Sequence, residues 1–195
     1  MQRLKPQETT IVELKAKVDN LEPFRKKLES LKAEYVGIFR QIDMYYEVPQ
    51  GRLKLRETEG ENGAHLVYYE RPDVKGPKQS QVFIIELSKP QFMKQFLNKV
   101  LCTKTVIDKQ RAIYRIEGTQ VHLDKAKKLG TYVEFERPTE NTPEATQKAH
   151  EKLEKLMQTL GIKPETLQKG SYSDLIMQKQ HEKWELENNK KHNNS

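Results

Sequence analysis

The sequence has little cysteine and no long apolar run. Its one cysteine, Cys102, excludes a disulfide scaffold and a cysteine-rich zinc site. We expect Cys102 to be buried and to pack as a small apolar residue. No stretch approaches the roughly 18 consecutive apolar residues of a transmembrane helix. The first residues carry charges with no apolar segment behind them, which is not typical of a secretory signal. These absences favour a cytoplasmic protein that does not enter a membrane.

Apolar residues are also scarce overall. They make up 35% of the 195 residues, while 32% are charged and the formal net charge is +7. Globular domains usually have roughly 45–50% apolar residues, with glycine included, and roughly 25% charged ones. Either much of the chain is disordered, or the fold places charges where other proteins place a core. The length favours one domain, or one domain with a tail.

The spacing of apolar residues distinguishes between these possibilities, because most of the chain is periodic. Alternation of apolar and polar residues, or enrichment in aromatic and β-branched ones, predicts eight strands: 10–18, 35–48, 52–57, 65–71, 81–87, 104–116, 120–124 and 131–137. Apolar residues spaced three and four apart predict amphipathic helices at 21–33, 90–100 and 145–160. Gly161 should end the last of these helices.

Several of these strands are joined by short turns, as at Pro49–Gly51, which makes neighbours antiparallel. Eight antiparallel strands can close into a barrel and leave no free edge. We therefore predict an α+β fold, an eight-stranded antiparallel β-barrel with flanking amphipathic helices. The expected organisation is an N-terminal extension at 1–9, the barrel domain at 10–176 and a polar C-terminal tail at 177–195, which is either a loosely held helix or a frayed end.

The polar faces of these strands are unusually pure in charge. An ordinary half-solvated sheet would mix Thr, Ser, Gln and Lys, and this remains the alternative for any one strand. Like charges along one face repel unless a counter-ion offsets them. If these faces line the barrel interior, its basic residues are Lys15, Lys17, Arg52, Lys54, Arg56, Lys109, Arg111 and Arg115. Its acidic residues are Glu13, Asp124, Glu134 and Glu136.

Eight basic against four acidic side chains would suit a chain of phosphates. Arginine offers forked donors to phosphate oxygens, and lysine offers a point charge. Clustered carboxylates suit Mg²⁺ or Mn²⁺, which prefer oxygen ligands and bridge to phosphates. The sequence therefore predicts a site for a chain of phosphates and a divalent cation.

Seven segments together resemble the CYTH superfamily, also called triphosphate tunnel metalloenzymes. They are VELKAKV (12–18), GRLKLRE (51–57), YYERPD (68–73), KQRAIYRI (109–116), VHLD (121–124), LGTYVEFE (129–136) and SYSDLI (171–176). The resemblance covers about 10–172 and is greatest to the branch of class IV adenylate cyclases. It implies an eight-stranded tunnel in which basic side chains grip a triphosphate and acidic ones bind one or two cations.

The resemblance also implies roles for single residues. Lys15, Lys54, Arg56, Lys109 and Arg111 match phosphate-binding positions, with Arg71 and Arg115 as additions. Glu13, Glu134 and Glu136 match metal ligands, with Asp124 as a fourth. We expect Lys15, Arg56, Lys109 and Arg111 to act in catalysis, by offsetting charge on the reacting phosphoryl group.

One position departs from the family signature Glu-x-Glu-x-Lys, because Ile11 stands where the first glutamate is expected. The leading hypothesis is metal-dependent hydrolysis of tripolyphosphate, thiamine triphosphate or a nucleoside triphosphate. A class IV-type adenylate cyclase is the first alternative, and a triphosphate-binding module with weak turnover, suggested by Ile11, is the second. Nucleic-acid binding is disfavoured, because the basic residues are spread over strands without a known motif. We expect a monomer or dimer.

Overall fold

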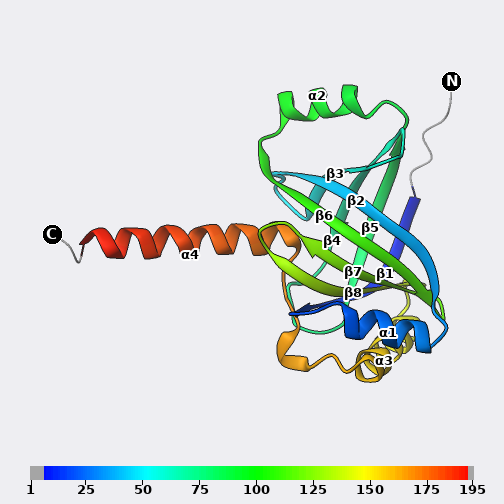
Figure 1. The fold of residues 1–195 in the computed structure, drawn as a ribbon. Helices are drawn as coiled ribbons and strands as arrows, with labels where there is room; N and C mark the ends of the chain where they lie inside the picture. Colours follow the sequence, from blue (N-terminus) through cyan, green and yellow to red (C-terminus); the bar gives the residue numbers. More distant parts are fainter. Residues whose placement is uncertain (1–6, 193–195) are drawn as a thin grey trace.

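The chain forms a closed barrel of eight antiparallel strands, as predicted (Figure 1). The computed structural model describes residues 7–192. The strand order around the barrel is β1-β5-β4-β3-β2-β6-β7-β8. The strands are β1 (Gln7–Val18), β2 (Glu34–Tyr46), β3 (Arg52–Thr58), β4 (Ala64–Glu70), β5 (Lys78–Leu87), β6 (Thr103–Ile116), β7 (Thr119–Ala126) and β8 (Gly130–Thr139).

Four α-helices accompany the barrel in the described part of the chain, together with a short 3₁₀ turn at Pro164–Thr166. They are α1 (Glu22–Ser30), α2 (Pro90–Val100), α3 (Pro143–Leu160) and α4 (Tyr172–His192). The first three are the predicted amphipathic helices. Thr142 caps α3 by accepting a hydrogen bond from the Ala145 amide, and Gly161 ends it in the left-handed conformation (φ 73°), which glycine adopts without strain.

The main apolar core lies outside the barrel wall rather than within it. Val12, Leu14 and Ala16 of β1 point outward and pack with Leu153 and Leu160 of α3. The alternate β1 residues Glu13 and Lys15 are also buried, on the inner face. The scarcity of apolar residues follows from this arrangement, because the barrel interior is charged while helices cover part of its exterior.

The C-terminal tail forms a helix, which is one of the two forms that its sequence allowed. Where a polar tail was predicted, α4 runs continuously from Tyr172 and projects from the barrel (Figure 1). Its first turn packs on the barrel, with Ile176 in the apolar cluster beside Tyr132. Residues 1–6 of the expected extension and 193–195 of the tail lie outside the described residues. None of the helices between residues 7 and 192 has the length and hydropathy of a membrane span.

The expectation for Cys102 was wrong, because its side chain is exposed. It lies between α2 and β6, where the chain turns. The apolar residues that precede it, Leu97 and Leu101, fill the small core under α2 instead.

Candidate active site

A charged cavity runs into the barrel from the inner faces of the strands. It has a volume of about 120 Å³. Its lining comes from seven of the eight strands, the turn after β4 and the residues around the start of α4, which contribute Ser171 and Tyr172. The charged residues that line it are Glu13, Lys15, Lys54, Arg56, Arg71, Arg111, Glu134 and Glu136.

Asp43 is the centre of a basic cluster on one side of this cavity. Arg56, directly opposite on β3, donates hydrogen bonds of 2.6 and 2.8 Å to its two carboxylate oxygens. Lys109 of β6 donates a third at 2.6 Å, and the Lys54 ammonium lies 3.5 Å away. Burial pushes the pKa of Asp43 upward, but Arg56 and Lys109 outweigh burial and hold the pKa well below its usual range. One acid therefore organises three bases.

The two lysines of this cluster are easily deprotonated. Burial, reinforced by the charge of Arg56, lowers the pKa of Lys109 to about 7 and that of Lys54 to about 8. Asp43 acts in the opposite direction on both. The lysines are thus partly charged near neutral pH, and an added anion would favour their charged forms.

A second cluster joins β6, β7 and β8 through Arg111. Its guanidinium donates to both oxygens of Asp124, at 2.8 and 2.6 Å, and to Glu134 at 2.5 Å. Lys15 of β1 also forms a short ion pair with Glu134. Burial raises the pKa of Glu134, but Lys15 and Arg111 outweigh it, and the carboxylate is held well below its ordinary pKa. Both acids of this cluster are therefore compensated within the barrel.

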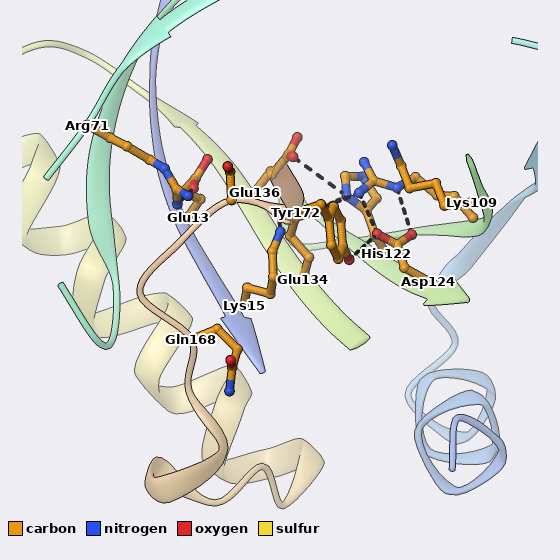
Figure 2. Close-up of polar contacts among 12 residues, drawn as sticks. Glu13, Lys15, Arg71, Lys109, His122, Asp124, Glu134, Glu136, Gln168 and Tyr172 are labelled. Carbon is orange, nitrogen blue, oxygen red and sulfur yellow. Dashed lines mark hydrogen bonds and ion pairs between the residues drawn. The ribbon is translucent and has the colours of Figure 1, made fainter. Parts of the chain in front are cut away.

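Tyr172 places the beginning of α4 against this second cluster. Its hydroxyl donates a 2.6 Å hydrogen bond to Asp124, and the Lys15 ammonium lies 3.9 Å from its ring centre. Figure 2 shows the ring reaching from the α4 segment toward Asp124, with Lys15 and Glu134 nearby. Four residues earlier, the backbone N–H of Gln168 donates a hydrogen bond to the backbone carbonyl of Lys15. The C-terminal segment thus forms part of the wall of the cavity.

A third group of side chains fits a divalent cation. One ligand atom each from His122, Glu134 and Glu136 lies within 4.8 Å of the others. The buried Nδ1 of His122 has no hydrogen-bond partner among the described residues and lies 3.7 Å from both carboxylates. Glu13 lies opposite Glu136 in register and pairs with Arg71, while burial raises its pKa. The Nε2 of the His122 ring lies 3.3 Å from Gln120 Oε1. Two carboxylates and the Nδ1 of this imidazole suit Mn²⁺, and the carboxylates suit Mg²⁺.

Most of the expected site residues meet around this cavity. Lys15, Lys54, Arg56, Arg71 and Arg111 line it together with Glu136, and ion pairs link these bases to Glu13, Asp43, Asp124 and Glu134. Lys109 does not line the cavity but is joined to Arg56 through Asp43. Two of the expected metal ligands already have partners on both carboxylate oxygens. Asp124 is held by Arg111 and Tyr172, and Glu134 is held by Lys15 and Arg111.

Three expected phosphate ligands lie elsewhere. Lys17 is exposed near the end of β1. Arg115 has a side chain 54% exposed and lies opposite Glu34, near the end of β6. Arg52 lies at a separate surface pocket, where it pairs with Asp73 and Asp174. With these bases outside and Asp43 inside, the positive excess around the cavity is smaller than the sequence suggested.

Sequence reasoning missed Asp43, the tunnel role of Tyr172 and the buried Lys78. Lys78 is 1% exposed and donates to the carbonyls of Val74 and Gln168, so it holds the C-terminal segment on β5. The only signal for Asp43 was a lone acid in the aromatic strand at 35–48. Tyr172 lay within the SYSDLI segment, whose contacts no periodicity reveals.

The chain is similar to known proteins in sequence and in fold. The CYTH domain matches residues 10–172. A protein of Methanocaldococcus jannaschii named "Putative adenylate cyclase MJ0240" is 25% identical over 174 residues, which cover 84% of this chain and 97% of that protein. The PH1012 protein of Pyrococcus horikoshii has a similar structure, with a TM-score of 0.75, 24% identity and coverage of 85% of this chain and 98% of that one. HpAC1 from Hippeastrum is more distant, with a TM-score of 0.56, 16% identity and coverage of 84% and 91%.

Proposed function

The chain belongs to the CYTH domain family, and we propose that it hydrolyses a triphosphate held inside the barrel, with the help of a divalent cation. The observation that carries the proposal is the set of basic side chains that line one cavity, namely Lys15, Lys54, Arg56, Arg71 and Arg111, with Lys109 joined to them through Asp43. Burying so many cations is costly unless anions accompany them. A phosphate chain offers the negative charge that such a lining would accept.

Internal acids compensate the bases while no substrate is bound. Asp43 keeps Arg56 and Lys109 side by side, and Asp124 with Glu134 fixes the Arg111 guanidinium. The donors are therefore oriented before the substrate arrives, which reduces the reorganisation that binding requires. In this proposal phosphate oxygens take over some of these hydrogen bonds. Lys54 binds most readily, because its contact with Asp43, at 3.5 Å, is the longest in the cluster.

Glu13, Glu134 and Glu136, with His122 beside them, would hold the cation. When bound, Mg²⁺ or Mn²⁺ supplies positive charge that offsets the charge developing on the reacting phosphoryl group. The chain's own residues do the rest. Arg56, Lys109 and Arg111 hold the phosphate oxygens, while Lys15, or a carboxylate next to it, orients the attacking water toward the terminal phosphorus. HpAC1, which shares this fold, is described as having a dominant triphosphatase activity.

A class IV-type adenylate cyclase is the first alternative. It is favoured by the name of the Methanocaldococcus relative. In that reaction the ribose hydroxyl of ATP attacks the α-phosphorus and pyrophosphate leaves. The same basic side chains would bind the phosphates in hydrolysis and in cyclisation, so only the reaction products distinguish the two activities.

A binding module with little turnover is the second alternative. Ile11 lines the cavity at the position where the family signature has its first acid. Fewer carboxylates would weaken cation binding and slow the reaction. Ile11→Glu would then raise activity sharply.

The test is product analysis with Mg²⁺ or Mn²⁺ and, in turn, tripolyphosphate, thiamine triphosphate and ATP. Phosphorus NMR separates orthophosphate from pyrophosphate, and chromatography detects cyclic AMP. We expect orthophosphate with at least one substrate and none in EDTA. Cyclic AMP and pyrophosphate without orthophosphate would favour the cyclase. No product from either reaction, combined with activity in Ile11→Glu, would favour the binding module.

A further inference from the structure

One wall of the charged cavity is apolar. Ile11, Val67, Val82 and Ile84 line it together with Tyr69. These residues are contiguous, because Val67 lies opposite Ile84, and Tyr69 opposite Val82, in the β4–β5 ladder. Ile11 and Ile84 pack against the same apolar cluster as the other three. The cavity therefore has a charged half and a continuous apolar half.

An unpartnered hydroxyl lies beside this wall. Ser80, directly opposite Ile11 on β5, is fully buried and lines the cavity. Its Oγ has no hydrogen-bond partner among the described residues. The Nε of Arg71, whose side chain is 1% exposed, is also without a partner there. Buried polar atoms are nearly always paired, so these two donors beside the cavity are available to hydrogen-bond a molecule bound there.

Building on the proposed function, we infer that this apolar wall and Ser80 bind the organic group of an organic triphosphate. The substrate class is then a triphosphate ester with an uncharged ring, such as a nucleobase, rather than inorganic tripolyphosphate. The aliphatic side chains contact the ring, and the Ser80 hydroxyl hydrogen-bonds to one of its heteroatoms or to a sugar hydroxyl.

The chemistry of the wall disfavours a bare phosphate chain. A phosphate oxygen placed against Ile11 and Val82 would lose its hydration without gaining a donor, which is costly. Electrostatic attraction acts in the other direction, because tripolyphosphate has a second ionisable terminal phosphate where an ester has none. Tighter binding of the organic triphosphate than of tripolyphosphate would therefore result from contact with the apolar wall and not from electrostatic attraction.

The experiment compares equilibrium binding of ATP and of tripolyphosphate by calorimetry in EDTA, so that no turnover is needed. We expect the wild-type protein to bind ATP about tenfold more tightly than tripolyphosphate. Val82→Thr adds a hydroxyl to the wall at almost constant volume, and Ser80→Ala removes the hydrogen-bonding group. Each should lower the affinity ratio several-fold, chiefly by weakening ATP binding.

Val121→Thr is the matched control, since Val121 is also fully buried but lies in the core outside the barrel. We expect this substitution to leave the affinity ratio unchanged, even if it destabilises the fold, because both ligands need the same folded protein. Equal or tighter binding of tripolyphosphate, or a ratio unchanged in both Val82→Thr and Ser80→Ala, would overturn this inference alone. Failure of both ligands to bind would overturn the proposed function together with it.

Discussion

Asp43 and Arg56 lie directly opposite each other on β2 and β3, and the carboxylate accepts two hydrogen bonds from the guanidinium, at 2.6 and 2.8 Å. Asp43 is fully buried and also accepts from Lys109 at 2.6 Å. A single acid thus supports three of the bases that the proposed function assigns to phosphate. Its role is to keep those bases together before a substrate arrives.

Asp43→Asn should destabilise the empty protein severely, because it leaves Arg56 and Lys109 buried without their counter-charge. Breaking a buried ion pair on one side costs about 3–5 kcal/mol. The measurement is urea unfolding without ligand and then with tripolyphosphate. We expect the ligand to restore much of the lost stability, since its oxygens can replace the carboxylate.

Asp108→Asn is the matched control for this change. Asp108 also accepts two hydrogen bonds from one arginine, Arg40, but the arginine side chain is 50% exposed. Water screens such a pair, so its loss should change stability only slightly. Equal destabilisation by the two substitutions would contradict a special role for Asp43.

Tyr172→Phe should weaken the attachment of α4 to the barrel. The substitution removes the 2.6 Å hydrogen bond to Asp124, and hydrogen bonds to charged groups contribute about 1.5–3 kcal/mol. Tyr132→Phe is the comparison, because its ring packs edge-on against Tyr172 but its hydroxyl makes only a 3.4 Å contact with the Leu129 carbonyl. Urea unfolding should show a clearly larger loss for Tyr172→Phe; the reverse order would refute this account of the tunnel wall.

Triphosphate binding should take up protons at pH 8 and weaken as the pH rises. In the free protein, burial and Arg56 lower the pKa of Lys109 to about 7 and of Lys54 to about 8. Bound phosphate favours the charged lysines and raises both pKa values, so protons enter on binding and affinity falls with increasing pH. A terminal phosphate has its last pKa near 6 and does not contribute at pH 8.

Calorimetry in buffers of different ionisation enthalpy measures this proton uptake. We expect a positive uptake at pH 8 that disappears near pH 6, where the lysines are already charged. Tighter binding at pH 9 than at pH 7, or no uptake at pH 8, would contradict the assignment of these lysines to phosphate.

The barrel could be predicted from the sequence because side chains alternate between the two faces of a strand, and this alternation can be read from each strand alone. The alternation of Arg52, Lys54 and Arg56 with Leu53 and Leu55 identifies an inner and an outer face without any knowledge of the partner strands. This alternation does not indicate how far along the barrel axis a residue lies. This is why Arg52, on the same face as Lys54, lies at a different pocket, and why Lys17 and Arg115 are exposed.

The centre of the site could not be predicted in the same way. Asp43 meets Arg56 and Lys109 only through the registers of β2 with β3 and with β6. Those registers depend on the closure of the whole barrel and not on local spacing. Tyr172 meets Asp124 because the chain after α3 returns along β1, through the bridge between Ala16 and Leu167. Such contacts between distant segments leave no periodic signal.

The most direct test of the central claim is a calorimetric titration of the wild-type protein with tripolyphosphate, compared with Arg111→Ala and Arg115→Ala. Arg111 is 3% exposed in the cavity, whereas Arg115 is half-exposed beside Glu34. We predict one site per chain, a loss of about 100-fold or more in affinity for Arg111→Ala, and an unchanged affinity for Arg115→Ala. Absence of saturable binding by the wild-type protein, or an equal loss in the two variants, would contradict a triphosphate site inside the barrel.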